Sequence, residues 1–418
     1  MFIYVVEKGD TLYNIAKAFN VSIDDITKLN AINKDDYLVV GQSLVIPSDS
    51  VTYKVSSGDT LYKIAKMYGI PLSNLIAYNP QITNPNSIVV GQIVNIPVSS
   101  FEPFDIIVNG YMLPGINEEI FEATLPYLDY LSIFSYEVMP NGNLRQIMDE
   151  KYIEKAKSKN VNSWLTITNI GGEGFSSEIA HEVFTNAEVQ ERLIENIITT
   201  ASLKGYSGVN IDFEYLYPED KDLYTAFLQN LNKDLKENGY ALAVAVAPKI
   251  SGNQEGLLYS AHDYEAIGRI ADIVIIMTYE WGYLYGDPQS ISPINKIDEV
   301  ISYATSVIPA KKILLGVSNY AYDWTLPYVK GTPAMIMSNI QALNLARTKG
   351  STIMFDEISK SPYFRYVTNT NEHIVWFEDS RTLYAKLDLV KRYGLQGISY
   401  WNINYFINPS GLLEKNEN

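Results

Sequence analysis

The sequence contains no cysteine and only three histidines in 418 residues. Without cysteine, the chain has no disulfide bond, no thiol nucleophile and no cysteine-ligated metal site. His181, His262 and His373 are not spaced as metal ligands are, so the sequence predicts neither a metal site nor a Ser-His-Asp triad. We expect each imidazole to lie at the surface or to be hydrogen-bonded in the core, and we predict no cofactor.

The chain also lacks the apolar segments of membrane and exported proteins. No run reaches the ~18 apolar residues that a membrane-spanning helix needs. The first residues, Met1-Phe-Ile-Tyr-Val-Val-Glu-Lys, have neither the basic start nor the long apolar stretch of a secretory signal peptide. We therefore expect no membrane insertion and no secretory signal.

Positive charge is scarce relative to negative charge. The net charge is −16, and residues 1–98 carry only −1 of it. An acidic body is repelled by the phosphates of nucleic acids and anionic lipids, so we predict neither as a partner. Aromatic residues are abundant, with 32 Tyr and 5 Trp, and together with carboxylates they suit a neutral polyhydroxylated ligand such as a glycan.

The first hundred residues contain an internal repeat. Tyr4-Val-Val-Glu-Lys-Gly-Asp-Thr-Leu-Tyr recurs as Tyr53-Lys-Val-Ser-Ser-Gly-Asp-Thr-Leu-Tyr, and both copies close on Val-Gly-Gln and then Ile-Pro. Apolar residues at helical spacing follow each Gly-Asp-Thr-Leu, so each copy predicts a strand, two helices and a second strand. Asp10 and Asp59 precede the first helix of their copies and are the predicted N-caps.

Both copies resemble LysM modules, which bind glycans that contain N-acetylglucosamine, chiefly peptidoglycan and chitin. The resemblance covers residues 1–48 and 50–98, and it implies two small α+β units. It also implies a glycan groove between the loop after the first strand and the loop after the second helix. The implied groove residues are Gly9, Asp10, Thr11, Leu12 and Asn30 in the first module and Gly58, Asp59, Thr60, Leu61 and Asn79 in the second.

After a short polar junction at Ser99-Ser100, residues 101–418 follow a different pattern, in which short apolar segments alternate with amphipathic helices. This alternation is typical of βα units and a parallel sheet. Eight such units predict a TIM-type α/β barrel. A hairpin is predicted as an insertion between strands seven and eight, at residues 363–377. The predicted strands are 106–111, 130–136, 163–168, 208–214, 241–247, 273–279, 313–317 and 397–401.

The fourth predicted strand carries two acids at its end. Asp212 and Glu214 are two residues apart and therefore project from the same face, with Asn210, whereas Phe213 projects from the opposite, apolar face. Two carboxylates on one face of a buried strand repel each other and lose hydration. The arrangement predicts a functional acid pair rather than the solvated face of an edge strand.

Other polar and aromatic residues follow neighbouring strands, where the active site of a TIM barrel lies. The sixth strand leads into Met277, Tyr279, Glu280 and Trp281, and the eighth ends at Trp401. Glu173 follows the third strand in a glycine-rich loop. Carboxylates for acid chemistry and aromatic rings for stacking predict a carbohydrate site at this end of the barrel.

These residues resemble glycoside hydrolase family 18, which includes chitinases and related N-acetylglucosaminidases. The fourth strand of that family reads Asp-x-x-Asp-x-Asp-x-Glu, and here Ser207 and Asn210 replace the first two acids while Asp212 and Glu214 match the others. The sixth strand of the family carries Met-x-Tyr-Asp, and Glu280 stands in place of that Asp. Its eighth strand ends in Trp, which Trp401 matches.

The resemblance implies a retaining, substrate-assisted mechanism. Glu214 would protonate the glycosidic oxygen while the acetamide oxygen of the substrate attacks the anomeric carbon. Asp212 would orient the acetamide, Tyr279 would hydrogen-bond to it, and Trp401 would form the floor beneath the sugar. Asn210 forms hydrogen bonds but cannot take up a proton, so the pH profile stays open.

Two LysM modules, this barrel and the absence of an evident signal peptide together resemble the spore cortical fragment-lytic enzymes of endospore-forming bacteria. The resemblance implies an N-acetylglucosaminidase that acts on peptidoglycan and is associated with the spore. A chitinase and a catalytically inactive glycan-binding lectin remain alternatives. The presence of Glu214 argues against the lectin, because lectins on this fold usually lose that acid.

Overall fold

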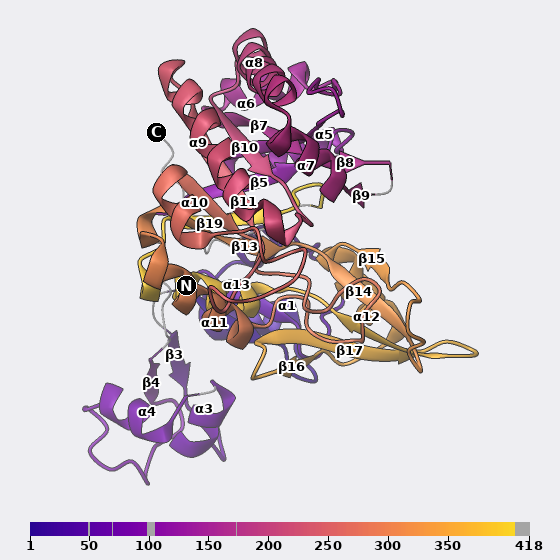
Figure 1. The fold of residues 1–418 in the computed structure, drawn as a ribbon. Helices are drawn as coiled ribbons and strands as arrows, with labels where there is room; N and C mark the ends of the chain where they lie inside the picture. The colour runs from indigo at the N-terminus through magenta and orange to yellow at the C-terminus, as the bar shows by residue number, and fades with distance from the viewer. Residues whose placement is uncertain (49–50, 69, 98–104, 173, 406–418) are drawn as a thin grey trace.

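The structure is a computed structural model that describes residues 1–48, 51–68, 70–97, 105–172 and 174–405. Two small α+β modules come first along the chain and a large α/β barrel follows (Figure 1). The predicted junction at Ser99-Ser100 and the predicted site residue Glu173 lie outside the described residues. Within the described ranges, no helix has both the length and the apolar character that a membrane crossing requires.

Each small module has the predicted order of strand, helix, helix and strand. In both modules the two strands pair antiparallel, and the apolar residues of the first helix face inward. The first module contains β1 (Phe2–Val5), α1 (Leu12–Phe19), α2 (Ile23–Asn30) and β2 (Ser43–Ile46), and the second contains β3 (Val51–Lys54), α3 (Leu61–Met67), α4 (Leu72–Tyr78) and β4 (Ile93–Ile96).

The predicted helix caps in these modules are wrong by one residue. Thr11 and Thr60 are the N-caps, and each hydroxyl accepts the backbone N–H three residues further on at 3.1 Å. Asp10 and Asp59 instead close the preceding turn. Each accepts the tyrosine hydroxyl six residues earlier at 2.7 Å, and the N–H three residues earlier at 2.8 Å for Asp10 and 2.7 Å for Asp59. Either side chain is a good cap by type, so the sequence alone did not distinguish them.

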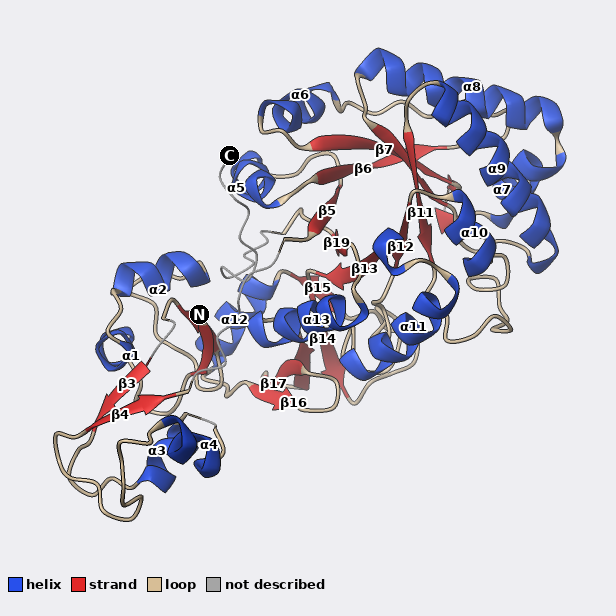
Figure 2. Ribbon diagram, turned by 90° about the vertical axis from the view of Figure 1, so that its left-hand side faces the viewer, coloured by secondary structure: helices blue, strands red, loops and turns tan. Residues whose placement is uncertain are grey.

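Eight parallel strands form the closed barrel, and Figure 2 shows helices around it. All eight predicted strands are confirmed, and their ends differ from the prediction by at most three residues. The strands are, in order around the barrel, β5 (Ile107–Met112), β6 (Tyr130–Glu137), β7 (Asn162–Thr168), β10 (Gly208–Asp212), β11 (Ala241–Val246), β12 (Ile273–Ile276), β13 (Ile313–Ser318) and β19 (Gly397–Trp401).

Helix α8 illustrates why the chain forms the outer helices where it does. The Asn186 side chain caps its start by accepting backbone N–H groups, and Gly205 ends it with φ +77°. Between them, every fourth residue from Val189 to Ala201 is buried against the barrel. The outer helices are α5 (Glu118–Thr124), α6 (Glu150–Ser158), α7 (Ser177–Thr185), α8 (Ala187–Lys204), α9 (Lys221–Glu237), α10 (Tyr264–Ile270), α11 (Ile294–Val307) and α13 (Ser380–Tyr393).

Between β13 and α13 the chain forms a separate antiparallel sheet, which we call the insertion. The predicted hairpin is confirmed as β17–β18, but it is only the centre of five strands, with α12 (Asn339–Lys349) packed against them. The strand order is β15 (Met335–Met337), β14 (Ala321–Leu326), β18 (Glu372–Trp376), β17 (Ser361–Val367) and β16 (Met354–Asp356).

An ion pair is enclosed where the insertion returns to the barrel. Lys386 is 0% exposed, and its Nζ lies 2.5 Å from Glu378 Oε2. The same ammonium donates to Ser292 Oγ at 2.6 Å, and Ser292 and Ser318 donate to the other carboxylate oxygen. A charge pair this deep is stable only because each member satisfies the other.

Replacing Lys386 with Met leaves the Glu378 carboxylate buried without its cation. We expect the free energy of unfolding to fall by about 3–5 kcal/mol, measured by urea unfolding with tryptophan fluorescence. The control is Lys296→Met, which removes an exposed pair with Glu299 and is expected to cost about 1 kcal/mol or less. Similar losses in the two variants would contradict a special role for the buried pair.

Candidate active site

A cavity of about 460 Å³ opens at the carboxyl ends of the barrel strands. β10 delivers two acids to it, the loop after β12 delivers a tyrosine, a glutamate and a tryptophan, and β19 ends at its floor. The structure thus brings together most of the site residues predicted from the barrel sequence: Asp212, Glu214, Met277, Tyr279, Glu280, Trp281 and Trp401.

Strand alternation positions the two acids as predicted. Asp212 is buried and Glu214 is half-buried, and both line the cavity. Phe213 between them points the other way, is 0% exposed, and stacks on Phe227 with ring centroids 5.8 Å apart. The aromatic contact fixes the opposite face of the strand end, so neither acid can turn away from the cavity without exposing a core ring.

Two buried side chains hold the backbone around Glu214. Asn169 accepts the Glu214 N–H at 2.9 Å and donates to the Glu214 carbonyl at 2.8 Å. One imidazole nitrogen of His262 donates to the Phe213 carbonyl at 3.0 Å while the other accepts the Ala247 N–H at 3.0 Å. Burial lowers the pKa of His262 to about 4, so the ring stays neutral and serves both bonds. Of the two placements predicted for each histidine, surface or hydrogen-bonded core, His262 takes the second.

Asn210 lies beneath the acid pair and contacts a residue that the sequence did not reveal. Its amide donates to the Tyr111 hydroxyl of β5 at 2.8 Å. Asn210 Oδ1 and Asp212 Oδ1 are buried and have no hydrogen-bond partner among the described residues. Buried acceptors are rarely left unpaired, so these two atoms mark a position for donors from a ligand.

The electrostatics of the site favour a protonated Glu214. Burial raises the pKa of Asp212 to about 7. Burial also raises the pKa of Glu214 well above its usual value, and the negative charges of Asp212 and Glu280 raise it further. Near neutral pH the site therefore holds a carboxylic acid next to a group able to carry negative charge, which is the requirement for general-acid chemistry.

Glu280 connects the cavity to the insertion. It has a left-handed backbone, with φ +67°, and its Oε1 accepts hydrogen bonds from the Tyr320 hydroxyl and, at 2.8 Å, from the Tyr322 hydroxyl. Burial raises the pKa of Glu280, and the two tyrosine hydrogen bonds oppose that shift. Neither tyrosine was among the predicted site residues, although their i, i+2 spacing indicates a shared face.

Aromatic residues surround the cavity beyond the predicted ones. The Trp401 indole stands edge-on to Phe134, with centroids 4.9 Å apart, and to Tyr111, at 5.5 Å. Tyr215 and Tyr283 lie at the rim and are 43% and 47% exposed. Exposed rings around a cleft with carboxylates are suited to stack on sugar rings.

The predicted LysM residues fall into two groups. Asp10, Thr11 and Leu12 line a groove of about 660 Å³ in the first module, where the loop 34–38 forms the other wall. Asn30 does not line it, because its side chain bonds to Ile26 and Val45 and ties α2 to β2.

The second module repeats these positions. Asn79 ties α4 to β4 in the same way, because its side-chain Oδ1 accepts the Asn95 N–H at 2.7 Å. Gly58, with φ +86°, matches Gly9, with φ +96°, and Asp59, Thr60 and Leu61 follow it as Asp10, Thr11 and Leu12 follow Gly9. Asn30 and Asn79 therefore brace their modules, and Asn30 lies outside the groove in which the sequence had predicted it.

Comparison with known proteins agrees with this geometry. Residues 115–405 match the family described as glycosyl hydrolases family 18, and residues 4–47 and 53–97 each match the LysM domain. The chain is 40% identical to the cortical fragment-lytic enzyme of Bacillus subtilis (strain 168), over 99% of this chain and 97% of that protein. Two solved structures, from Bacillus cereus and Chromobacterium violaceum, extend the comparison.

The crystal structure of the Bacillus cereus spore cortex-lytic enzyme SleL is similar over 98% of this chain and 96% of that one, with a TM-score of 0.84 and 36% identity. A chitinase from Chromobacterium violaceum ATCC 12472 covers 74% of this chain and 100% of its own, with a TM-score of 0.68 and 24% identity. At that identity the second likeness shows the fold alone.

The influence of Glu280 on Glu214 is testable by titration. Replacing Glu280 with Gln removes a negative charge that raises the pKa of Glu214, so the midpoint of the Glu214 titration should move to lower pH. Carbon-13 NMR of the glutamate carboxyl carbons measures it, and the resonance missing in Glu214→Gln identifies the group. Glu357→Gln, at an exposed surface pair, is the control that should leave the midpoint unchanged. A midpoint that stays or rises in Glu280→Gln would refute the coupling.

Proposed function

The chain belongs to glycosyl hydrolases family 18, and from this we propose that it is an N-acetylglucosaminidase that cleaves the peptidoglycan of the spore cortex or its fragments. One observation carries the proposal. Asp212 at the end of β10, with an unpaired buried oxygen, and Glu214 two residues further on line one cavity together with Trp401, and burial and the charge of Asp212 raise the pKa of Glu214. The pair supplies the acid and the acceptor that hydrolysis assisted by a substrate acetamide requires.

In the proposed first step, Glu214 gives its proton to the glycosidic oxygen as that oxygen leaves the anomeric carbon. The acetamide oxygen of the same sugar attacks the carbon from the other side and forms an oxazolinium ion. Asp212 accepts the acetamide N–H and balances the positive charge that develops on the nitrogen. Tyr279 donates to the acetamide, and Trp401 supports the sugar ring from below.

In the second step, the Glu214 carboxylate takes a proton from a water molecule that attacks the anomeric carbon. The oxazolinium ring opens, the acetamide is restored, and Glu214 is protonated again. Two attacks on opposite faces retain the configuration of the anomeric carbon. Because Asn210 cannot take up a proton, it cannot share one with Asp212, and its amide instead donates to the Tyr111 hydroxyl.

The likeness to relatives supports peptidoglycan over chitin as the substrate. Relatives named for lysis of spore cortex or its fragments match nearly the whole chain, including both LysM domains. The likeness to the chitinase covers 74% of the chain. In the proposal the LysM modules hold the enzyme on cortex glycan, and the protein is associated with the spore.

The proposal is tested by digesting spore-cortex peptidoglycan, vegetative wall and chitin with the parent and with Glu214→Gln. The parent should release new reducing-end N-acetylglucosamine from cortex, and the variant should be slower by about 10²–10⁴-fold, because general-acid assistance is lost. Mass spectrometry of borohydride-reduced products measures it, and Glu357→Gln should keep parental activity. Activity on chitin alone would favour a chitinase, and tight binding without turnover on any glycan would favour a lectin.

The anchoring role is tested with exposed tyrosines of the modules. Tyr13 lines the first groove and is 63% exposed, and Tyr62 is its counterpart in the second module at 64%. Replacing both with Ala should weaken hydrolysis of insoluble cortex while leaving soluble fragments unaffected, because only the polymer engages several sites at once. Tyr78→Ala, at an exposed tyrosine on α4, is the matched control. Equal losses on both substrates would contradict anchoring.

A further inference from the structure

The first LysM module is docked on the insertion. The Ile353 N–H donates to the Val40 carbonyl at 2.9 Å, and Arg381 donates to the Gly41 carbonyl at 3.1 Å. Val39 is 5% exposed and lies in one apolar cluster with Ile353 and other insertion residues. Hydrogen bonds to backbone carbonyls and apolar packing thus act together at this contact, and they hold the module in one orientation.

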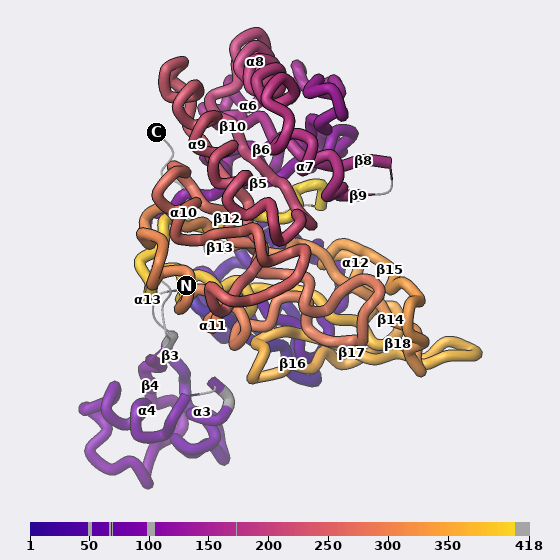
Figure 3. Tube along the Cα trace, in the orientation of Figure 1, coloured from indigo at the N-terminus to yellow at the C-terminus, as the bar shows by residue number. Residues whose placement is uncertain are grey.

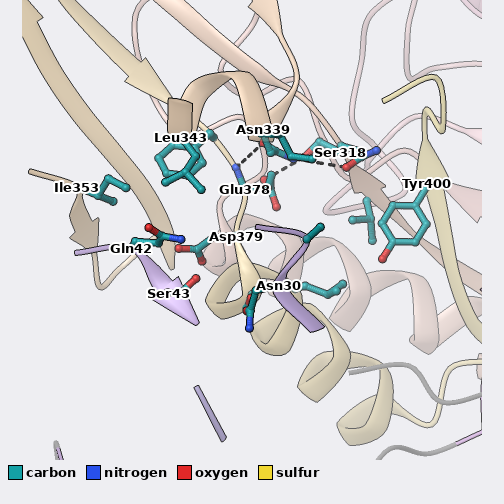
Figure 4. Close-up of a pocket in the computed structure, with 17 residues that line it drawn as sticks. Asn30, Gln42, Ser43, Ser318, Asn339, Leu343, Ile353, Glu378, Asp379 and Tyr400 are labelled. Carbon is teal, nitrogen blue, oxygen red and sulfur yellow. Dashed lines mark hydrogen bonds between the residues drawn. The ribbon is translucent and has the colours of Figure 1, made fainter. Parts of the chain in front are cut away.

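Figure 4 is a close-up of this contact between the first module and the insertion. Asn30, Gln42 and Ser43 of the first module face Ile353 and Asp379 across a cavity of about 140 Å³. The cavity is much smaller than the cleft or the groove, and we assign it no ligand.

The same segment of the second module has different surroundings. Its internal bond is the same, since Gln92 Oε1 accepts the Val89 N–H at 2.9 Å just as Gln42 Oε1 accepts the Val39 N–H at 3.1 Å. Val89, however, is 64% exposed and its neighbour Val90 69%. Figure 3 shows the second module set apart from the barrel. Docking is therefore a property of the first module and its partner surface, not of the LysM fold.

The second module is attached to the first. Residues of both modules share an apolar cluster, in which the rings of Phe19 and Tyr68 have centroids 5.8 Å apart.

The docking loop of the first module is also a wall of its glycan groove. Asp36 and Tyr37 line that groove, and Tyr37 is 83% exposed. Arg347 of α12 donates from Nε to the Tyr37 carbonyl at 2.7 Å, and its Nη2 lies 3.6 Å from Asp36 Oδ2. The insertion thus holds the groove wall directly.

The insertion reaches the catalytic cleft at its other end. Tyr320 and Tyr322 hold Glu280 there. Arg381 lies in the first turn of α13, a helix that runs between two parallel strands and so begins at the carboxyl end of the barrel, the same end as the cleft. The groove of the first module and the catalytic cleft are therefore both held by the insertion and the helices next to it.

We propose that the first LysM module is a fixed subsite for glycan that contains N-acetylglucosamine, held at a constant distance from the cleft by the insertion. The second module is carried on the first through their shared apolar cluster, and the valines that match the docking segment, Val89 and Val90, are exposed. The inference rests on the proposed function for the chemistry of the ligand. Its consequence is that glycan held in the first groove enters the cleft at a set spacing, so cortex is cut faster and into products of narrower length distribution than an undocked module would allow.

Two glycines provide a matched pair for the test. Gly41 has φ +86°, and a Cβ there would lie 1.9 Å from the Ile353 carbonyl oxygen. Gly91 occupies the same position in the second module with φ +90°, and its Cβ would meet only Lys54 Cε at 3.9 Å. Alanine imposes the same left-handed strain at both, but only Gly41→Ala also breaks the dock.

Docking can be measured with labels attached to introduced cysteines, because the chain has no cysteine of its own that would also be labelled. Spin labels on Lys17→Cys in α1 and Leu203→Cys in α8 report the distance between module and barrel. We expect a narrow distribution of label-to-label distances in the parent and in the control variant Gly91→Ala. In Gly41→Ala we expect a broad distribution. A narrow distribution in all three would overturn the fixed docking.

Activity tests the subsite itself. Gly41→Ala should hydrolyse short soluble cortex fragments as the parent does, but should cut insoluble cortex about tenfold more slowly and into a broader range of lengths. Arg347→Ala should act in the same direction, with Arg269→Ala at an exposed surface pair as its control. If Gly41→Ala loses the dock yet matches Gly91→Ala on cortex, the subsite inference is wrong while the proposed function stands. If the parent protein cleaves no glycan, the proposed function itself is contradicted.

Discussion

Burial of two carboxyl groups at and just beyond the end of β10 is the constraint on which the rest of the site depends. Asp212 and Glu214 repel each other when both are ionised, and burial penalises each charge. The strand end would turn to relieve that repulsion if the backbone were free. Asn169 holds the backbone at Glu214 from both sides, His262 holds the Phe213 carbonyl, and Phe213 is stacked into the core. The rigid barrel thus holds the two carboxyl groups near each other, and this arrangement raises the pKa of Glu214.

The insertion extends this rigidity beyond the barrel. Its tyrosines hold Glu280, a third acid that raises the pKa of Glu214, and its outer side holds the first LysM module. Glu280 stands where the motif of the resembled family has Asp, and its carboxylate accepts both tyrosine hydroxyls. The insertion and the helix packed on it thus bear on the pKa of Glu214 and on the position of the groove in the first module, and in our proposal this ties the chemistry to the presentation of the polymer.

The sequence predicted well those features that depend on residues close together in the chain. Apolar runs and period-two alternation gave all eight barrel strands and the shared face of Asp212 and Glu214. The edge strands of the insertion were missed because they are three residues long and exposed, as Met335 at 63% shows, and β14 was missed although it has six residues, four of them buried. The contacts of Asn169 and Tyr111 were not predicted because their partners lie 45 and 99 positions away. The docking was invisible because the Val-Val-Gly-Gln segment that makes it occurs in both modules.

The unpaired oxygens of Asn210 and Asp212 give the substitution of the family's second acid a physical meaning. An acid at position 210 could share a proton with Asp212, whereas Asn210 uses its amide to fix Tyr111 and leaves Oδ1 without a partner among the described residues. A buried acceptor left unpaired costs about 1–3 kcal/mol. The same cost applies to the unpaired Oδ1 of Asp212. In the proposed mechanism the acetamide N–H of the substrate donates to Asp212 and removes that part of the cost, and the contact strengthens as positive charge develops on the nitrogen, which would favour the charged intermediate over the bound substrate.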